Sequence, residues 1–265
     1  MKFFKKFYLV LIYILLYAPI AVLIVFSFNQ SRDLVNFTGF TLKWYRELFA
    51  NSTYLPLLKN TLLLAVSSSL IATVVGTAAA LGITRMRRRA RNAVIAATNI
   101  PMTNPEIVTG VSLALLFVFI GALLKTNNVF GFVTMLIAHV TFNLPYVILS
   151  VLPRITQMDR YLTDAALDLG CTPVQTFFRV TLPEILPGVV SGMTMAFLLS
   201  LDDFVISYFV SGTSFTTLPI YIYSETKKPM SPTVYALFTL MFLAILTLLV
   251  LSNLLGREKK DKTKT

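Results

Sequence analysis

The feature that most constrains this chain is a series of apolar runs, each long enough to cross a membrane. The first extends from Phe7 to Phe28, and about 22 residues of helix cover about 33 Å, which spans a bilayer core. Only 13% of the residues are charged, whereas soluble domains carry about 25%. The other runs cover residues 60–84, 93–124, 130–152, 185–210 and 233–255. We therefore expect an all-α polytopic membrane protein with six transmembrane helices.

Basic residues predict the orientation of these spans. One side of the membrane would hold the two ends of the chain, the Arg85–Arg91 loop and residues 154–183. These segments contain 16 of the 23 Lys and Arg residues. Because basic loops stay in the cytoplasm, both termini are expected there, with residues 256–265 as a basic tail. This distribution accounts for most of the net charge of +11 without a nucleic-acid partner. The alternative for Arg85–Arg91 is a patch that binds nucleic acid or anionic lipid.

A polar segment between two apolar runs carries signals for two short, capped helices. Gly170 is suited to the left-handed conformation that ends a helix. Thr172, Pro173 and Gln175 then match a helix start, with Thr172 as N-cap, proline at the first position and Gln175 closing a capping box. We expect a rigid helical hairpin, which a protein outside the membrane can hold.

Acidic residues inside apolar runs are the candidate functional groups. Glu106 follows two prolines, Pro101 and Pro105, which should break the run at membrane depth. Asp202 and Asp203 point about 100° apart on a helix. Asp203 shares a face with small and polar residues, namely Gly192, Ala196, Ser200, Ser207 and Ser211. We expect Asp203 to face the pathway and Asp202 to pair with a neighbouring helix; structural pairing is the alternative for both.

Signatures of catalysis are scarce. The sequence lacks a G-x-x-x-x-G-K-[ST] run and an H-E-x-x-H run, and it has one cysteine and one histidine. His139 is therefore interpreted as a neutral residue that bonds neighbouring helices, with a proton relay as the alternative. We expect that the chain is not an enzyme and that it binds no metal or cofactor of its own.

The polar segment resembles the "EAA" loop of bacterial ABC-importer permeases. That pattern is Glu-Ala-Ala, three residues, Gly, nine residues, Ile, one residue and Leu-Pro. Here Asp164, Ala165 and Ala166 are followed at the same spacing by Gly170 and by Leu182-Pro183; Asp164 replaces Glu and Val180 replaces Ile. The resemblance implies that this loop docks into a groove of a cytoplasmic ATPase.

Four further stretches look like those of spermidine/putrescine importer permeases, namely residues 105–113, 139–142, 199–207 and 218–224. The resemblance implies a type I ABC-importer permease in a bacterial inner membrane, with a second permease, two ATPase copies that hold ATP and Mg²⁺, and an extracytoplasmic polyamine-binding protein. It divides the chain into three parts. Residues 1–56 form a first helix and outer loop, residues 57–255 form a transmembrane core that contains the coupling loop 154–183, and residues 256–265 form the tail.

A cationic substrate fits the candidate residues. Glu106, Asp202 and Asp203 can replace water around ammonium groups in a low-dielectric pathway, and Tyr221 and Tyr223 can add cation–π contacts at its outer mouth. Three alternative functions remain for this chain. They are an ABC-importer permease for ferric ion or an amino acid, a proton-coupled transporter that works alone, and an intramembrane enzyme.

Overall fold

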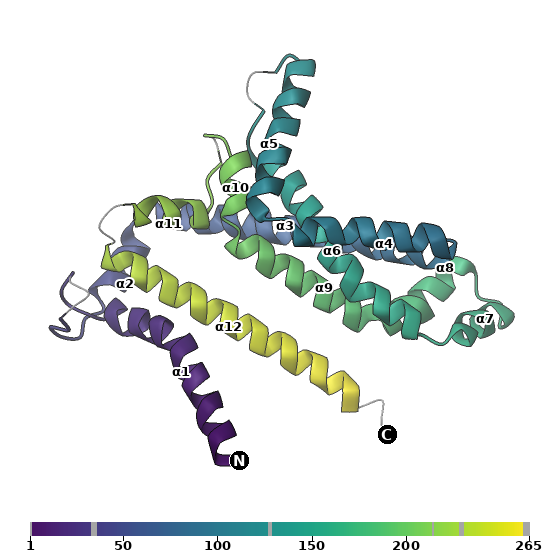
Figure 1. Cartoon of the computed structure of the whole chain (residues 1–265), viewed down its shortest axis with the longest axis horizontal. Helices are drawn as coiled ribbons and strands as arrows, with labels where there is room; N and C mark the ends of the chain where they lie inside the picture. The colour runs from purple at the N-terminus through teal and green to yellow at the C-terminus, as the bar shows by residue number, and fades with distance from the viewer. Residues whose placement is uncertain (1, 33–35, 127–128, 214, 228–230, 262–265) are drawn as a thin grey trace. The chain divides into compact units, whose positions relative to one another are not determined.

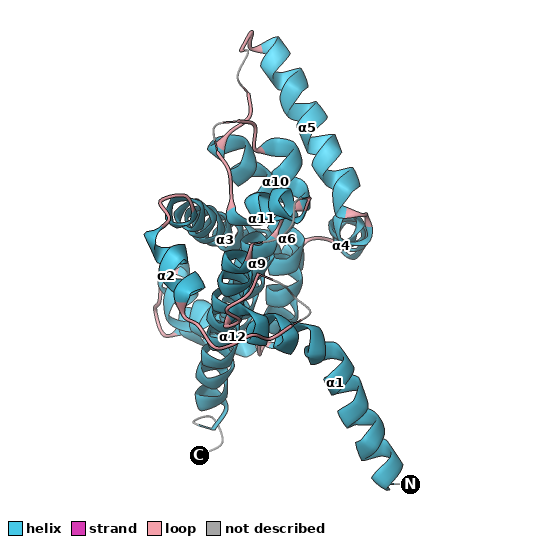
Figure 2. Ribbon diagram, turned by 90° about the vertical axis from the view of Figure 1, so that its left-hand side faces the viewer, coloured by secondary structure: helices cyan, strands magenta, loops and turns pink. Residues whose placement is uncertain are grey.

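The chain is helical in the computed structural model, which describes residues 2–32, 36–126, 129–213, 215–227 and 231–261. Figure 2 shows helices and connecting loops throughout this described part, where Asn29 and Phe40 form an isolated β-bridge. The helices are α1 (Lys2–Ser27), α2 (Lys43–Ala50), α3 (Tyr54–Arg85), α4 (Arg88–Thr103), α5 (Glu106–Leu123), α6 (Phe132–Gln157), α7 (Arg160–Asp168), α8 (Pro173–Thr176), α9 (Leu182–Asp202), α10 (Val205–Val210), α11 (Leu218–Thr226) and α12 (Pro232–Asp261), with a π-helical turn at Phe177–Thr181 (Figure 1).

Within the described residues, five helical segments are long and apolar enough to cross a membrane. They are Lys6–Ser27, Tyr54–Arg85, Glu106–Leu123, Phe132–Gln157 and Pro173–Asp202. A shorter apolar segment, Pro232–Thr247, lies in α12. The all-α prediction is therefore confirmed. Residues 262–265 of the basic tail lie outside the described residues.

The run from 93 to 124 is interrupted where the prolines predict. Helix α4 ends at Thr103, Asn104 and Pro105 are extended, and α5 begins at Glu106. Pro105 fixes its own φ near −60° and keeps Asn104 out of the helical region, so the helix cannot continue through this point. The break places Glu106 in the first turn of α5, where a carboxylate is favourable near free backbone N–H groups.

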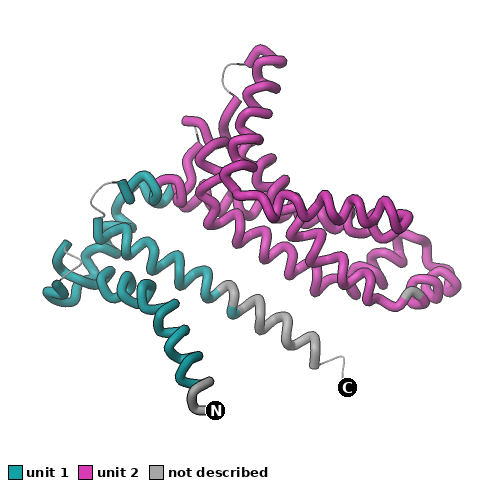
Figure 3. Tube along the Cα trace, viewed as in Figure 1, with its two compact units in different colours: residues 1–56, 222–265 teal, residues 57–221 magenta. Residues whose placement is uncertain are grey.

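The chain divides into two compact units, residues 1–56 with 222–265 and residues 57–221 (Figure 3). In the first unit, α12 packs against α1 and α2. The loop after α1 is held by the Trp44 indole, whose Nε1 donates to the carbonyl of Asn29 at 2.6 Å. Helix α2 and helix α11 lie in stretches that the sequence patterns did not distinguish from loop.

In the second unit, α6 and α9 lie side by side and form the most extensive helix pair (Figure 1). Gly188 and Gly192 make this approach possible, because they lie one turn apart on the face of α9 that meets α6. A Cβ atom at position 188 would lie 2.9 Å from the carbonyl oxygen of Ser150 and 2.7 Å from the Arg154 Cγ. Close packing of α6 on α9 positions the polar residues described below.

We expect Gly188→Ala to lower the thermal stability of the protein, by about 1–2 kcal/mol, because the added methyl group overpacks the α6–α9 contact. Gly82→Ala is the matched control, since a Cβ atom there meets nothing within 4 Å. That change should leave stability unaltered or raise it by about 0.5–1 kcal/mol through helix propensity. Melting curves of the two variants test this; equal shifts in the same direction would contradict the packing argument.

Candidate functional site

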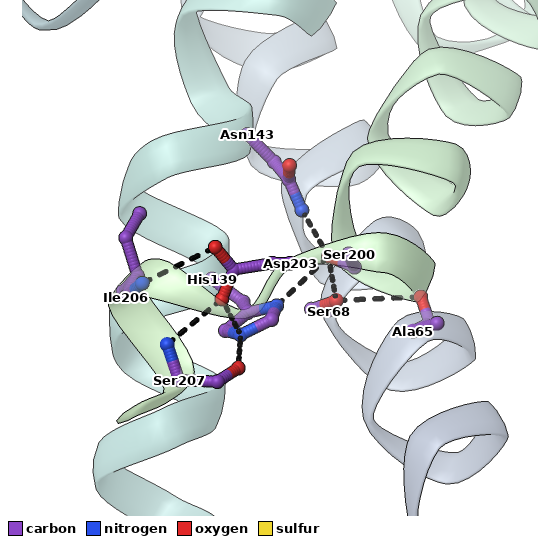
Figure 4. A network of polar contacts seen from close by, with 8 residues as sticks. All are labelled: Ala65, Ser68, His139, Asn143, Ser200, Asp203, Ile206 and Ser207. Atoms are coloured by element: carbon purple, nitrogen blue, oxygen red, sulfur yellow. Dashed lines mark hydrogen bonds and ion pairs between the residues drawn. The ribbon is translucent and has the colours of Figure 1, made fainter. Parts of the chain in front are cut away.

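A buried polar cluster joins four helices in the second unit (Figure 4). Its members come from α3, α6, α9 and α10 and from the turn between the last two, namely Ser68, His139, Asn143, Ser200, Asp203 and Ser207. None of these side chains exceeds 7% exposure. Buried polar groups must find hydrogen-bond partners, so this cluster fixes the helices that contribute to it.

Ser200 is the centre of the cluster. Its Oγ lies 2.7 Å from the Asn143 Nδ2, 2.9 Å from the Ser68 Oγ and 3.1 Å from the His139 Nδ1. A hydroxyl has one proton and accepts two hydrogen bonds. When the His139 ring is neutral with its proton on Nε2, Ser200 accepts from Asn143 and Ser68 and donates to the His139 Nδ1. All three contacts of the hydroxyl are then satisfied.

Asp203 is the charged residue of the cluster. One carboxylate oxygen, Oδ2, lies 3.3 Å from the His139 Nε2 and accepts from the Ser207 N–H at 2.8 Å. The other, Oδ1, accepts from the Ile206 N–H at 3.2 Å. The His139 Nε2 also lies 2.9 Å from the Ser207 Oγ. The carboxylate therefore caps the first turn of α10 and anchors it to α6.

Helix α9 ends at Asp202, and Asp203 has an extended conformation with φ −62° and ψ 119°. The prediction of one continuous helix over residues 185–210 is therefore wrong. At the break, the Asp203 side chain takes the N–H groups of Ile206 and Ser207 that a continuous helix would bond to backbone carbonyls. The small and polar face is nevertheless buried on both sides of the break, at Gly192, Ala196, Ser200, Asp203, Ser207 and Ser211.

The surroundings of the two aspartates differ from those expected for them. Asp203 is 7% exposed and satisfied within its own chain, so its side chain does not face an open space. Asp202 is exposed, and no donor on a neighbouring helix bonds its carboxylate among the described residues. The break explains both placements, because residue 203 turns inward to cap α10 while residue 202 stays on the outer face of α9.

Glu106 is the second exposed carboxylate near this break. A Cβ atom at Gly110, one turn further along α5, would lie 3.3 Å from the Ile206 Cα, so this part of α5 packs directly on α10. Glu106 lies one helical turn before this contact, and Asp202 lies at the end of α9 just before α10. Both exposed carboxylates therefore lie on elements that meet around the α9–α10 break.

The predicted tyrosines occupy α11. Tyr221 is partly buried, whereas Tyr223 is exposed. The ring of Tyr223 is covered by a cation of the chain itself, because the Lys227 Nζ lies 5.1 Å from the ring centroid. A cation–π contact of Tyr223 with a substrate stays a prediction.

The capped hairpin predicted around Gly170 is confirmed. Gly170 has φ +86°. Its N–H donates to the carbonyl of Leu167 at 2.9 Å, and the N–H of Cys171 donates to the carbonyl of Ala166 at 3.0 Å. These two bonds form a Schellman motif that ends α7. Thr172 then starts α8: its Oγ1 accepts from the Gln175 N–H at 3.3 Å, and its own N–H donates to the Gln175 Oε1 at 3.0 Å.

The end of this loop differs from the expectation. Leu182 and Pro183 do not end a loop but begin α9, and the helix is continuous from Pro173 through the π-helical turn to Asp202. Pro183 directly follows the π-helical turn, whose last bond joins the Leu182 N–H to the Phe177 carbonyl, so the missing N–H of proline falls where the α-helical bonding pattern is already interrupted. The hairpin residues Asp164 and Ala165 are exposed on α7, whereas Ala166 is buried beneath them. A continuous helix therefore connects the hairpin to the buried cluster.

The sequence patterns missed the centre of the cluster, although they offered a signal for it. His139 and Asn143 lie four residues apart and so share one face of α6, and Ser200 lies on the polar face of α9. The interhelical hydrogen bonds predicted for His139 are confirmed. Within the described ranges, no group of three or more His, Cys, Asp or Glu side chains is placed to hold a metal ion.

Comparison with known proteins identifies the family of this chain. Residues 72–257 match the model of the binding-protein-dependent transport system inner membrane component. The chain belongs to this family of transport-system permeases. It is 39% identical over 256 residues, 97% of both chains, to the spermidine/putrescine transport system permease protein PotC of Haemophilus influenzae. It is 39% identical to PotC of Escherichia coli, over 94% of this chain and 92% of that protein.

A third relative is the putrescine transport system permease protein PotI of Escherichia coli, 38% identical over 87% of this chain and 82% of that protein. The permease fold is also found in solved structures of distant sequence. A bacterial ABC transporter that imports alginate superposes with a TM-score of 0.73 at 16% identity, covering 97% of this chain and 95% of that one. The MetNI methionine ABC transporter gives a TM-score of 0.62 at 18% identity, covering 82% and 98%. This inner-membrane permease is thus homologous to polyamine permeases and has the fold of ABC importers.

Proposed function

We propose that this chain is the membrane-spanning subunit of an ATP-driven importer for polyamines such as spermidine and putrescine. The observation that carries this proposal is the relationship to PotC over nearly the full length of both chains. A relationship confined to the hairpin would support any ABC importer. Similarity across the spans favours a shared substrate class, because the spans line the route of the solute.

We further propose six spans with both termini in the cytoplasm. Five long apolar segments and the shorter one in α12 support this number, and the basic loops support the orientation. The hairpin from Arg160 to Gln175 then lies in the cytoplasm. Its exposed Asp164 and Ala165 are available to an ATPase subunit, and the continuous helix behind it can transmit a movement to Ser200 and Asp203.

The proposed complex contains a homologous second permease, two copies of an ATPase and an extracytoplasmic binding protein. ATP and Mg²⁺ would be held by the ATPase, since this chain has no phosphate-binding G-x-x-x-x-G-K-[ST] run. This chain would then supply half of the pathway and no catalysis of its own.

Glu106 and Asp202 are the proposed contacts for the substrate. An ionised carboxylate exposed to lipid near the membrane centre costs about 3 kcal/mol, so these side chains should face water or the second permease instead. Two neighbouring carboxylates also attract a cation that carries two ammonium groups. Asp203, satisfied by its own chain, would position the end of α9 rather than bind the substrate. Binding should be weak, because a tight site would trap the substrate.

We expect Asp202→Asn and Glu106→Gln each to lower polyamine uptake at limiting concentration by roughly tenfold, through loss of a charge-assisted contact to the substrate. The measurement is ATP-dependent uptake of labelled spermidine into vesicles that contain the assembled transporter. Glu47→Gln is the matched control, because Glu47 is an exposed carboxylate 3.7 Å from Lys43 in the first unit. Unchanged uptake in both variants would remove these carboxylates from the pathway.

The same vesicles test the proposed substrate class. Unlabelled putrescine should compete with spermidine, whereas ferric ion and amino acids should not. Uptake should also require ATP and the ATPase subunit. Uptake by the chain without nucleotide would favour a proton-coupled transporter and would contradict the proposal.

A further inference from the structure

We propose that a cavity beneath the capped hairpin binds a phosphate group. The cavity has a volume of about 330 Å³ and lies between the end of α3 and the segment from α7 to the π-helical turn. Its lining comprises Leu81, Gly82, Arg85, Thr163, Leu167, Pro173, Thr176, Phe177 and Thr181. Its combination of one cation, three hydroxyl groups and an apolar wall matches a phosphate ester better than it matches a polyamine.

Thr176 supplies the observation that points to a ligand. Its side chain is 2% exposed and lines the cavity, and its Oγ1 has no hydrogen-bond partner. Most Ser and Thr hydroxyls on helices of this chain bond a carbonyl three or four residues earlier, as Thr61, Thr73 and Thr141 do. Thr176 does not. An unpaired buried hydroxyl costs free energy, and rotation of the Thr176 side chain towards the cavity would let its Oγ1 pair with a ligand there.

Arg85 supplies the charge. It is the last residue of α3, it lines the cavity, and no acidic side chain pairs with it among the described residues. A guanidinium group with free N–H groups binds phosphate oxygens in pairs. Asp164 and Asp168 follow the lining residues Thr163 and Leu167 in sequence but do not line the cavity themselves. The charge presented to the interior is therefore positive.

The remaining walls suit a phosphate that is attached to an organic group. Leu81, Leu167 and Phe177 offer apolar contact, and Gly82 leaves room because a Cβ atom there would meet nothing within 4 Å. The π-helical turn that begins at Phe177 widens the backbone beside the cavity, and its final bond joins the Leu182 N–H to the Phe177 carbonyl. An anionic phospholipid headgroup and a soluble phosphate compound share this chemistry.

Three variants distinguish binding in this cavity from nonspecific electrostatic binding elsewhere on the protein. Arg85→Gln removes the cation, Thr176→Val removes the hydroxyl, and Gly82→Leu places a bulky side chain on the wall of the cavity. Arg88→Gln is the control, because it removes an equal charge three residues away outside the cavity. The variants are made in the assembled transporter, purified in neutral detergent. Binding is measured by native mass spectrometry and by the shift in melting temperature.

The probes are short-chain phosphatidylglycerol with phosphatidylcholine for comparison, and inorganic phosphate with chloride at equal ionic strength. Preferential binding of phosphatidylglycerol, weakened roughly tenfold by Arg85→Gln and lost in Gly82→Leu but kept in Arg88→Gln, supports a lipid ligand. The same pattern with inorganic phosphate supports a soluble ligand. Thr176→Val should weaken binding without lowering the melting temperature of the ligand-free protein. Equal binding by wild type, Arg85→Gln and Gly82→Leu, or no binding of either probe to wild type, overturns the proposal.

Discussion

We expect Asp203→Ala to destabilise the protein by about 3–5 kcal/mol and to lower the yield of assembled transporter. The substitution removes the acceptor for the Ile206 and Ser207 N–H groups and for the His139 Nε2. The two backbone donors are then buried without a partner, and each costs about 1–3 kcal/mol, whereas the His139 Nε2 keeps its contact with the Ser207 Oγ. No water can replace the carboxylate cheaply, because the side chain is only 7% exposed.

The matched control for this prediction is Asp202→Ala. It removes the same group one residue earlier, where the side chain is exposed. We expect its stability to stay within about 0.5 kcal/mol of wild type. Thermal unfolding of the purified transporter, followed by size-exclusion chromatography after heating, compares the two. Equal losses in both variants would show that the carboxylate of Asp203 does not hold the α9–α10 break together.

A double variant separates the two partners. Because Asp203 and His139 share one contact, Asp203→Ala combined with His139→Ala should lose less stability than the sum of the single losses. Asp203→Asn keeps the shape and one acceptor oxygen. In the fraction that folds, the apparent affinity for spermidine should remain near that of wild type, whereas Asp202→Asn weakens it. Weaker affinity in Asp203→Asn alone would return Asp203 to the substrate pathway.

The hairpin could be predicted from the sequence because its signals are local. Gly170, Thr172, Pro173 and Gln175 act on backbone groups within five residues of themselves. The proline break before Glu106 was predictable for the same reason. In each case, the residue type determines the conformation without help from the rest of the chain.

The break at Asp203 could not be predicted in this way. Helical spacing placed Asp203 correctly on the buried face with Ser200 and Ser207, but it gave no reason for the helix to end there. The end depends on His139, which is 64 residues away in the sequence and supplies the contact that holds the carboxylate inside. Such a contact exists only after α6 has packed on α9. The exposure of Asp202 follows from the same packing and was missed with it.

The second large effect is expected on transport, from a change at Gly170 in the hairpin. We expect Gly170→Val to lower ATP-dependent polyamine uptake by roughly tenfold, because φ at this position is +86° and a β-branched residue resists that conformation by about 1–3 kcal/mol. A Cβ atom at Gly170 meets nothing within 4 Å, so the strain comes from the backbone alone. The Schellman bonds of Gly170 and Cys171 should break, which loosens the joint between α7 and α8.

Gly170→Asn is the matched control, since asparagine tolerates the left-handed conformation and also adds a polar side chain at the exposed position. It should retain most of the uptake, while Gly170→Val should not. The two variants are compared in vesicles at equal protein content, together with the ATPase rate. If the hairpin transmits movement from an ATPase, Gly170→Val should hydrolyse ATP with little uptake or bind the ATPase poorly. Uptake and hydrolysis equal to wild type in Gly170→Val would mean that the stiffness of this hairpin plays no part in transport.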